Sequence, residues 1–202
     1  MKKNILLIFG VAILLSCGNT KNENANANNN ASDTADMALI SDNNNNASNS
    51  SDNWDQGDIK EFVEKASNGG LLEVKLADAA QKRALSQQVK DLGKMIATEH
   101  KDANDKLKGA IKALQLNAPT DLSKDYKDKL ENLQKKNGQE FDKDYVDFLV
   151  DNHKSDIDDF EKAQANLPEG DLKMWVSNTL PVLRKHLAEA KYVQQQLKNE
   201  SK

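Results

Sequence analysis

Several residue types are scarce in this chain of 202 residues, which has one cysteine, three prolines, nine glycines and 5% aromatic residues. A single cysteine excludes an internal disulfide framework and a cysteine-based zinc site. So few prolines and glycines are unusual for an all-β sandwich. Lys and Arg number 28 against 32 Asp and Glu, giving a net charge of −4, so we expect no nucleic-acid partner. With 30% charged and 38% hydrophobic residues, the composition favours amphipathic helices.

The N-terminus has the features of a secretory signal. Lys2 and Lys3 precede an apolar run over residues 5–15, which ends just before Ser16 and Cys17. The run is shorter than the roughly 20 residues that a membrane-spanning helix needs. The small residue followed by the only cysteine resembles the bacterial lipobox, which implies cleavage before the cysteine and lipid attachment to it. An ordinary signal peptide with an incidental cysteine is the alternative.

Residues 17–53 are predicted to be a lipidated cysteine followed by a disordered tether. The segment is dominated by Asn, Ser, Asp and Ala, so it lacks the apolar surface needed to offset the entropy cost of ordering. We therefore expect residues 1–16 to be removed and the membrane to be the partner, through the lipid on Cys17. A bacterial cell-envelope location follows. Gly18, where sorting signals in some bacteria have Asp, favours the outer membrane, facing the periplasm or the cell surface.

From residue 54 to 202 the apolar residues repeat with a period near 3.6, which predicts an all-α domain. Asp58 and Ser86 are expected N-caps, and Gly69 and Gly70 mark a weak point in the first helix. The expected helices span residues 58–83, 86–115, 123–136, 139–166 and 171–199. Four long helices with a short helix in the long connection are typical of a four-helix bundle.

Each long helix places one candidate metal ligand on or beside its apolar face: Glu73, His100, His153 and His186. These are all the histidines of the chain. A buried carboxylate is costly without a partner. Three imidazoles converging on it would satisfy it either as a hydrogen-bonded polar cluster or as the ligands of one Zn, Fe, Mn or Cu ion.

Other polar residues near these faces are expected to be solvated or to support the ligands from outside. Asn104 and Asn152 are close enough to the apolar faces to hydrogen-bond a ligand. The acidic residues in the same position are Glu99 and Asp102 beside His100, and Asp151, Asp156 and Asp159 around His153.

Four sequence segments resemble the bacterial ferritin-like domain-of-unknown-function family 4142. They are Phe62-Val63 to Glu73-Val74, Glu99-His100 to Leu107, Phe141-Asp142 to Phe160, and Thr179-Leu180-Pro181 to His186-Leu187. The resemblance covers residues 57–197 and implies a ferritin-like four-helix bundle in an exported protein. It implies no activity.

The di-iron pattern of ferritin-like proteins, a Glu three residues before a His, is absent. The residues at that position are Ala97, Val150 and Leu183. We therefore expect a single ion and no catalytic residue, in a lipid-anchored envelope protein. The alternatives are a metal-free interaction or stress-maintenance module, and an enzyme with an open metal position, for which no general base is recognisable.

Overall fold

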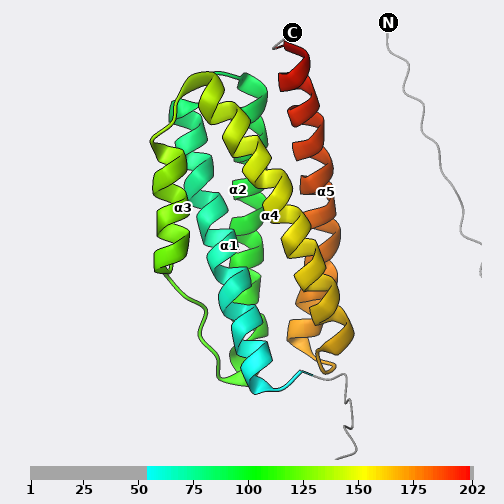
Figure 1. The fold of residues 1–202 in the computed structure, drawn as a ribbon. Helices are drawn as coiled ribbons and strands as arrows, with labels where there is room; N and C mark the ends of the chain where they lie inside the picture. The colour runs from blue at the N-terminus through cyan, green and yellow to red at the C-terminus, as the bar shows by residue number, and fades with distance from the viewer. Residues whose placement is uncertain (1–53, 201–202) are drawn as a thin grey trace, which may run out of the picture. The chain divides into compact units, whose positions relative to one another are not determined.

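The computed structural model describes residues 54–200, and this part of the chain is entirely helical (Figure 1). The all-α fold class is therefore confirmed. The predicted signal peptide, Cys17 and the tether lie outside the described residues. The elements are α1 (Gln56–Arg83), α2 (Gln87–Ala110), a 3₁₀ helix η1 (Lys112–Leu114), α3 (Lys124–Gln134), α4 (Gly138–Asn166) and α5 (Asp171–Glu200).

Helix α1 starts earlier than predicted because Asp55, and not Asp58, is its N-cap. The Asp55 Oδ1 atom accepts hydrogen bonds from the backbone amides of Gly57 (2.7 Å) and Asp58 (3.0 Å). The Asp58 carboxylate accepts one from the Asp55 amide in return, which completes a capping box. The predicted weak point at Gly69 and Gly70 is also wrong, since α1 runs through both glycines without interruption.

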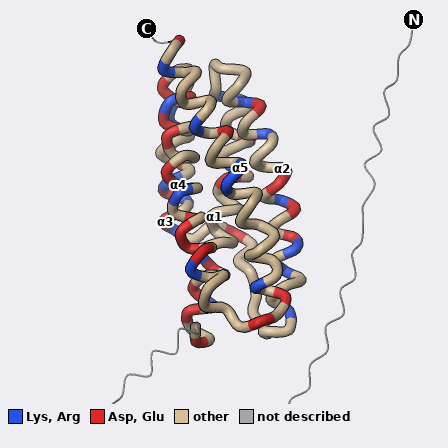
Figure 2. The backbone as a smooth tube through the Cα atoms, turned by 90° about the vertical axis from the view of Figure 1, so that its right-hand side faces the viewer, with Lys and Arg blue, Asp and Glu red and all other residues tan. Residues whose placement is uncertain are grey.

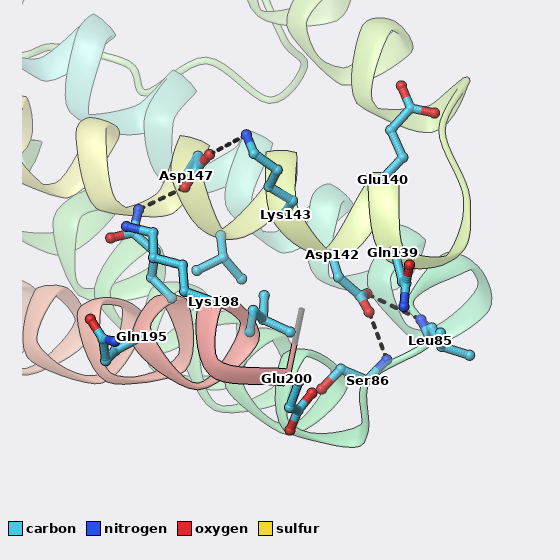
Figure 3. Close-up of a pocket in the computed structure, with 13 residues that line it drawn as sticks. Leu85, Ser86, Gln139, Glu140, Asp142, Lys143, Asp147, Gln195, Lys198 and Glu200 are labelled. Atoms are coloured by element: carbon cyan, nitrogen blue, oxygen red, sulfur yellow. Dashed lines mark hydrogen bonds and ion pairs between the residues drawn. The ribbon is translucent and has the colours of Figure 1, made fainter. Parts of the chain in front are cut away.

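Helix α2 has Ser86 at its N-cap, as predicted, but the serine side chain makes no capping hydrogen bond. The buried Asp142 of α4 accepts hydrogen bonds from the backbone amides of Leu85 (3.1 Å) and Ser86 (2.7 Å) instead (Figure 3). One carboxylate thus caps α2 and fixes the α1–α2 turn against α4. At its other end α2 stops at Ala110 and tightens into η1, where the sequence predicted one helix to residue 115.

The long helices pack as a bundle. α1 lies against α2 and α4, and α5 lies against α4 and α2, while α3 packs on α1 and, less extensively, on α4. In Figure 1, α1 and α5 run upward and α2 and α4 run downward, because the connection through α3 returns the chain to the end where α2 began.

The core consists of two apolar clusters along the bundle. One contains the aromatic contacts of Phe62 with Phe160 and Trp175, and the other contains Phe141 stacked on Tyr145. On each long helix the predicted ligand lies between a residue of one cluster and a residue of the other. The four predicted ligands therefore lie between the two apolar clusters.

The surface carries charges of both signs. Figure 2 shows acidic and basic residues interleaved along the helices, and many form ion pairs one helical turn apart, such as Lys106 with Asp102. No helix between residues 54 and 200 has the length and apolar character needed to cross a bilayer.

Candidate metal centre

The structure brings Glu73, His100, His153 and His186 together at the middle of the bundle, one from each long helix. Glu73, His153 and His186 are fully buried, and His100 is 7% exposed. The three histidines each offer one nitrogen, and these nitrogens lie within 4.8 Å of one another. His153, which the sequence placed near the edge of its apolar face, is as deeply buried as the others.

Glu73 joins the histidines through both carboxylate oxygens. Its Oε1 atom lies 3.3 Å from His153 Nδ1 and accepts a hydrogen bond of 3.1 Å from the side-chain amide of Asn152. Its Oε2 atom is in ion-pair contact with His100 Nε2. These two buried atoms are partners of each other, and neither has a further hydrogen-bond partner.

The partners of His153 and His186 determine which ring nitrogens carry a proton. His153 Nδ1 lies 3.0 Å from the Leu149 carbonyl oxygen, which can only accept, so Nδ1 is the donor. His186 Nε2 lies 2.9 Å from Glu99 Oε2. Partial burial alone would raise the pKa of Glu99, but hydrogen bonds from Lys185 and His186 lower it, so Glu99 is an ionised acceptor and His186 Nε2 is also a donor.

The remaining nitrogens, His153 Nε2 and His186 Nδ1, face each other at 3.2 Å. Burial lowers the pKa of His153. Burial, with the neighbouring His100 and His153, lowers the pKa of His186 to about 4. Both rings are therefore neutral at pH 7, and each turns a lone pair toward the other. Two facing lone pairs repel unless a cation lies beside them.

Glu73 and His100 carry the charges of the cluster. Burial alone would raise the pKa of Glu73, but His153 and His100 lower it to about 2. Burial alone would lower the pKa of His100, but Glu73 raises it above its ordinary value of 6.5. In the metal-free cluster, the ionised Glu73 carboxylate thus favours the protonated form of His100, beside two neutral imidazoles.

The three histidine nitrogens lie close enough together to share one ion in a tetrahedral shell. Two nitrogens 3.2 Å apart, each bonded at about 2.0–2.1 Å, subtend about 100–105° at the ion, close to the tetrahedral angle. Such a shell spaces its atoms about 3.4 Å apart, so the widest of the histidine separations must close by on the order of 1 Å. The hydrogen bonds to Leu149 and Glu99 already orient His153 and His186 in the way that supporting groups orient metal-ligating histidines.

The supporting residues are only partly those that the sequence suggested. Asn152 bonds Glu73, and Glu99 bonds His186, as outer partners. Asp102 and Asp151 are exposed and pair with lysines on their own helices. The buried hydroxyl of Tyr145 on α4 has no hydrogen-bond partner, and its pKa is raised by burial, with Glu73 adding to the shift.

A surface groove of about 730 Å³ lies between the ends of α4 and α5 and the α1–α2 turn (Figure 3). It is lined by Asp142, Lys143, Asp147 and Lys198, among others, and by none of the four predicted ligands. This groove is therefore separate from the histidine cluster.

These observations define a class of protein, a helical bundle whose core holds a buried three-histidine cluster with the capacity to bind a metal ion. The chain matches the family model described as a domain of unknown function (DUF4142) over residues 43–193, and it belongs to this family. Membership of this family was predicted from the sequence and is confirmed, whereas the ferritin-like topology stays a prediction. No match was found among curated proteins or among solved structures.

Proposed function

We propose that the protein binds one divalent transition-metal ion through Glu73, His100, His153 and His186. The observation that carries the proposal is the pair of facing lone pairs on His153 and His186, whose nitrogens lie 3.2 Å apart within a buried group of three histidines. One ion would satisfy both lone pairs. Three imidazoles and a carboxylate suit Zn²⁺, Fe²⁺, Mn²⁺ or Cu²⁺.

The site would serve storage, sensing or structure and not open-site catalysis. Four protein ligands fill a tetrahedral shell and leave no position for a substrate. The buried position of all four side chains supports a closed site. The helix directions, with one long connection between α2 and α4, support a ferritin-like topology with a single-ion site in place of a di-iron one.

Metal analysis of the full chain, purified without a histidine tag, tests the proposal. We expect about one ion per chain after incubation with Zn²⁺, Fe²⁺, Mn²⁺ or Cu²⁺. A His100→Ala/His186→Ala variant should lose the ion and keep its helical circular dichroism spectrum. A wild-type chain that takes up none of the four metals would rule the proposal out.

A second candidate is a metal-free envelope interaction or stress-maintenance module. It is favoured by the contacts of the histidines within the protein, since His153 and His186 use hydrogen bonds to Leu149 and Glu99, and His100 contacts Glu73. In this case the cluster only orders the core. The same metal analysis separates the two candidates.

We also propose that the protein is a lipoprotein of the bacterial envelope, held by lipid on Cys17. The basic N-terminus, the short apolar run and the single cysteine after Ser16 support this anchor. Multiple acyl chains hold a protein firmly, since each buried CH₂ contributes about 0.8 kcal/mol. Cys17→Ser should move the protein from the membrane fraction to the soluble fraction, whereas Ser51→Ala should leave it membrane-bound.

A further inference from the structure

Polar side chains connect buried Glu73 to the surface of α4. The side-chain nitrogen of Asn152 donates one hydrogen bond to Glu73 Oε1 (3.1 Å) and another to Asp156 Oδ2 (2.8 Å). Asp156 lies one turn further along α4 and is partly exposed. A single amide therefore links a carboxylate inside the bundle to a carboxylate at its edge.

Helix α1 is shaped to admit these polar groups. A Cβ on Gly70 would lie only 2.5 Å from Asn104 Oδ1, so no other residue fits there without displacing Asn104. A Cβ on the adjacent Gly69 would lie 3.9 Å from Asp156 Oδ2. Gly70 lies one turn before Glu73 and lets the Asn104 amide approach the helix backbone, whereas a Cβ on Gly69 would make only an ordinary contact with Asp156.

On the other polar side of the cluster, the link to the surface runs through Glu99, and both of its carboxylate oxygens are already hydrogen-bonded. Glu99 also links a buried ligand to the surface, but its Oε2 atom bonds His186 and its Oε1 atom bonds the Lys185 ammonium. On the Asp156 side, the neighbouring lysine, Lys65, forms its ion pair with Asp159 and not with Asp156. Among residues 54–200, Asp156 Oδ1 has no hydrogen bond or ion pair, so it remains available to a cation.

We propose that Asp156 and Asn152 form the access path by which a hydrated divalent cation reaches Glu73 and the three histidines. This inference rests on the proposed metal site. A cation cannot cross the apolar parts of the core at acceptable cost, because an uncompensated charge there is strongly disfavoured. The Asp156 carboxylate attracts the ion. The Asn152 amide, whose nitrogen donates to both carboxylates in the metal-free protein, then turns to present its carbonyl oxygen, and this oxygen and the Glu73 carboxylate replace the waters of the ion in succession.

The test compares Asp156→Asn with wild type in stopped-flow binding of Co²⁺ at pH 8. Burial of the Asp156 carboxylate raises its pKa to about 7, so at pH 8 it is mostly ionised. Asparagine keeps an oxygen to accept the Asn152 hydrogen bond and removes only the charge. Asp158→Asn is the matched control, because Asp158 is an exposed acid on the same helix.

We expect Asp156→Asn to slow Co²⁺ association about tenfold or more, which is within the range of electrostatic effects on association rates. Release to a chelator should slow as well, so the affinity changes less than the rates. The absorption spectrum of bound Co²⁺ should stay unchanged, because the four ligands are intact. High salt should reduce the difference between variant and wild type.

Two results would overturn the access path. In the first, Asp156→Asn binds Co²⁺ at the same association rate as Asp158→Asn. In the second, Asp156→Asn alters the absorption spectrum of bound Co²⁺, which would place Asp156 among the ligands. Both require that wild type binds Co²⁺. Failure of wild type to bind any of the metals would contradict the proposed function itself, so the two failures are distinguishable.

Discussion

The Glu73 carboxylate should make the stability of the metal-free protein depend on pH in acid. The pKa of Glu73 is lowered from 4.5 to about 2 because His153 and His100 outweigh the opposing effect of burial. One pKa unit corresponds to about 1.4 kcal/mol, so the ionised carboxylate contributes roughly 3 kcal/mol to the free energy of unfolding. That contribution is fully present above pH 4.5 and is lost as the pH falls toward 2.

The ion pair between Glu73 and His100 should also weaken at high pH. The pKa of His100 is raised above 6.5 because Glu73 outweighs the effect of burial, so the stability from the His100 charge is present below pH 6.5 and lost as the pH rises through the folded value. In Glu73→Gln, both effects disappear and burial alone acts on His100. The stability lost in Glu73→Gln should therefore be largest near pH 5–6 and shrink on either side.

Urea unfolding of both proteins from pH 3 to 9, with a chelator present, measures this difference. Glu61→Gln, at an exposed acid on the same helix, is the control for a general change in net charge. Gln keeps an oxygen for the Asn152 hydrogen bond, so the comparison isolates the charge. Stability curves of wild type and Glu73→Gln that run parallel across this pH range would refute the reasoning.

Other changes should alter stability through packing and capping, again measured by urea unfolding. Gly70→Ala should lose most of the roughly 1 kcal/mol that Ala gains over Gly in a helix, because its Cβ would lie 2.5 Å from Asn104 Oδ1 and the asparagine side chain must move. A Cβ on Gly109 would meet nothing within 4 Å, so Gly109→Ala should stabilise the protein by about 0.4–1 kcal/mol. Equal effects of the two substitutions would contradict the close approach of Asn104 to Gly70. Asp142→Ala should lower the free energy of unfolding by about 1–3 kcal/mol, since it leaves two backbone amides at the start of α2 without an acceptor. A smaller decrease than at an ordinary surface site would show that water replaces the carboxylate as acceptor.

Most of the fold follows from local sequence signals. Apolar periodicity and the Pro168–Gly170 turn place the long helices, with boundaries shifted by a few residues. The capping of α2 was not predictable, because its acceptor, Asp142, lies more than 50 residues away in sequence. The continuity of α1 through Gly69 and Gly70 likewise depends on packing, which outweighs the low helix propensity of glycine.

For the histidine cluster, the sequence predicts only which residues lie on the inward faces of the helices. The inward positions of Glu73 and the three histidines follow from the 3.6-residue period. The protonation pattern does not, because it depends on the Leu149 carbonyl and on the Glu99 carboxylate, whose distances to the rings only the folded chain fixes. Whether these groups bind a metal stays a prediction.

The positions of Glu73 and the three histidines along the chain have a consequence for unfolding. Glu73 and His100 belong to the α1–α2 hairpin, and His153 and His186 belong to the α4–α5 hairpin. An ion at the cluster would therefore join the two hairpins as a non-covalent cross-link. At a metal concentration 100 times its Kd this adds about 2.7 kcal/mol against unfolding. Hydrogen exchange in the central turns of all four helices would then slow together, because opening either hairpin breaks the same ligand set.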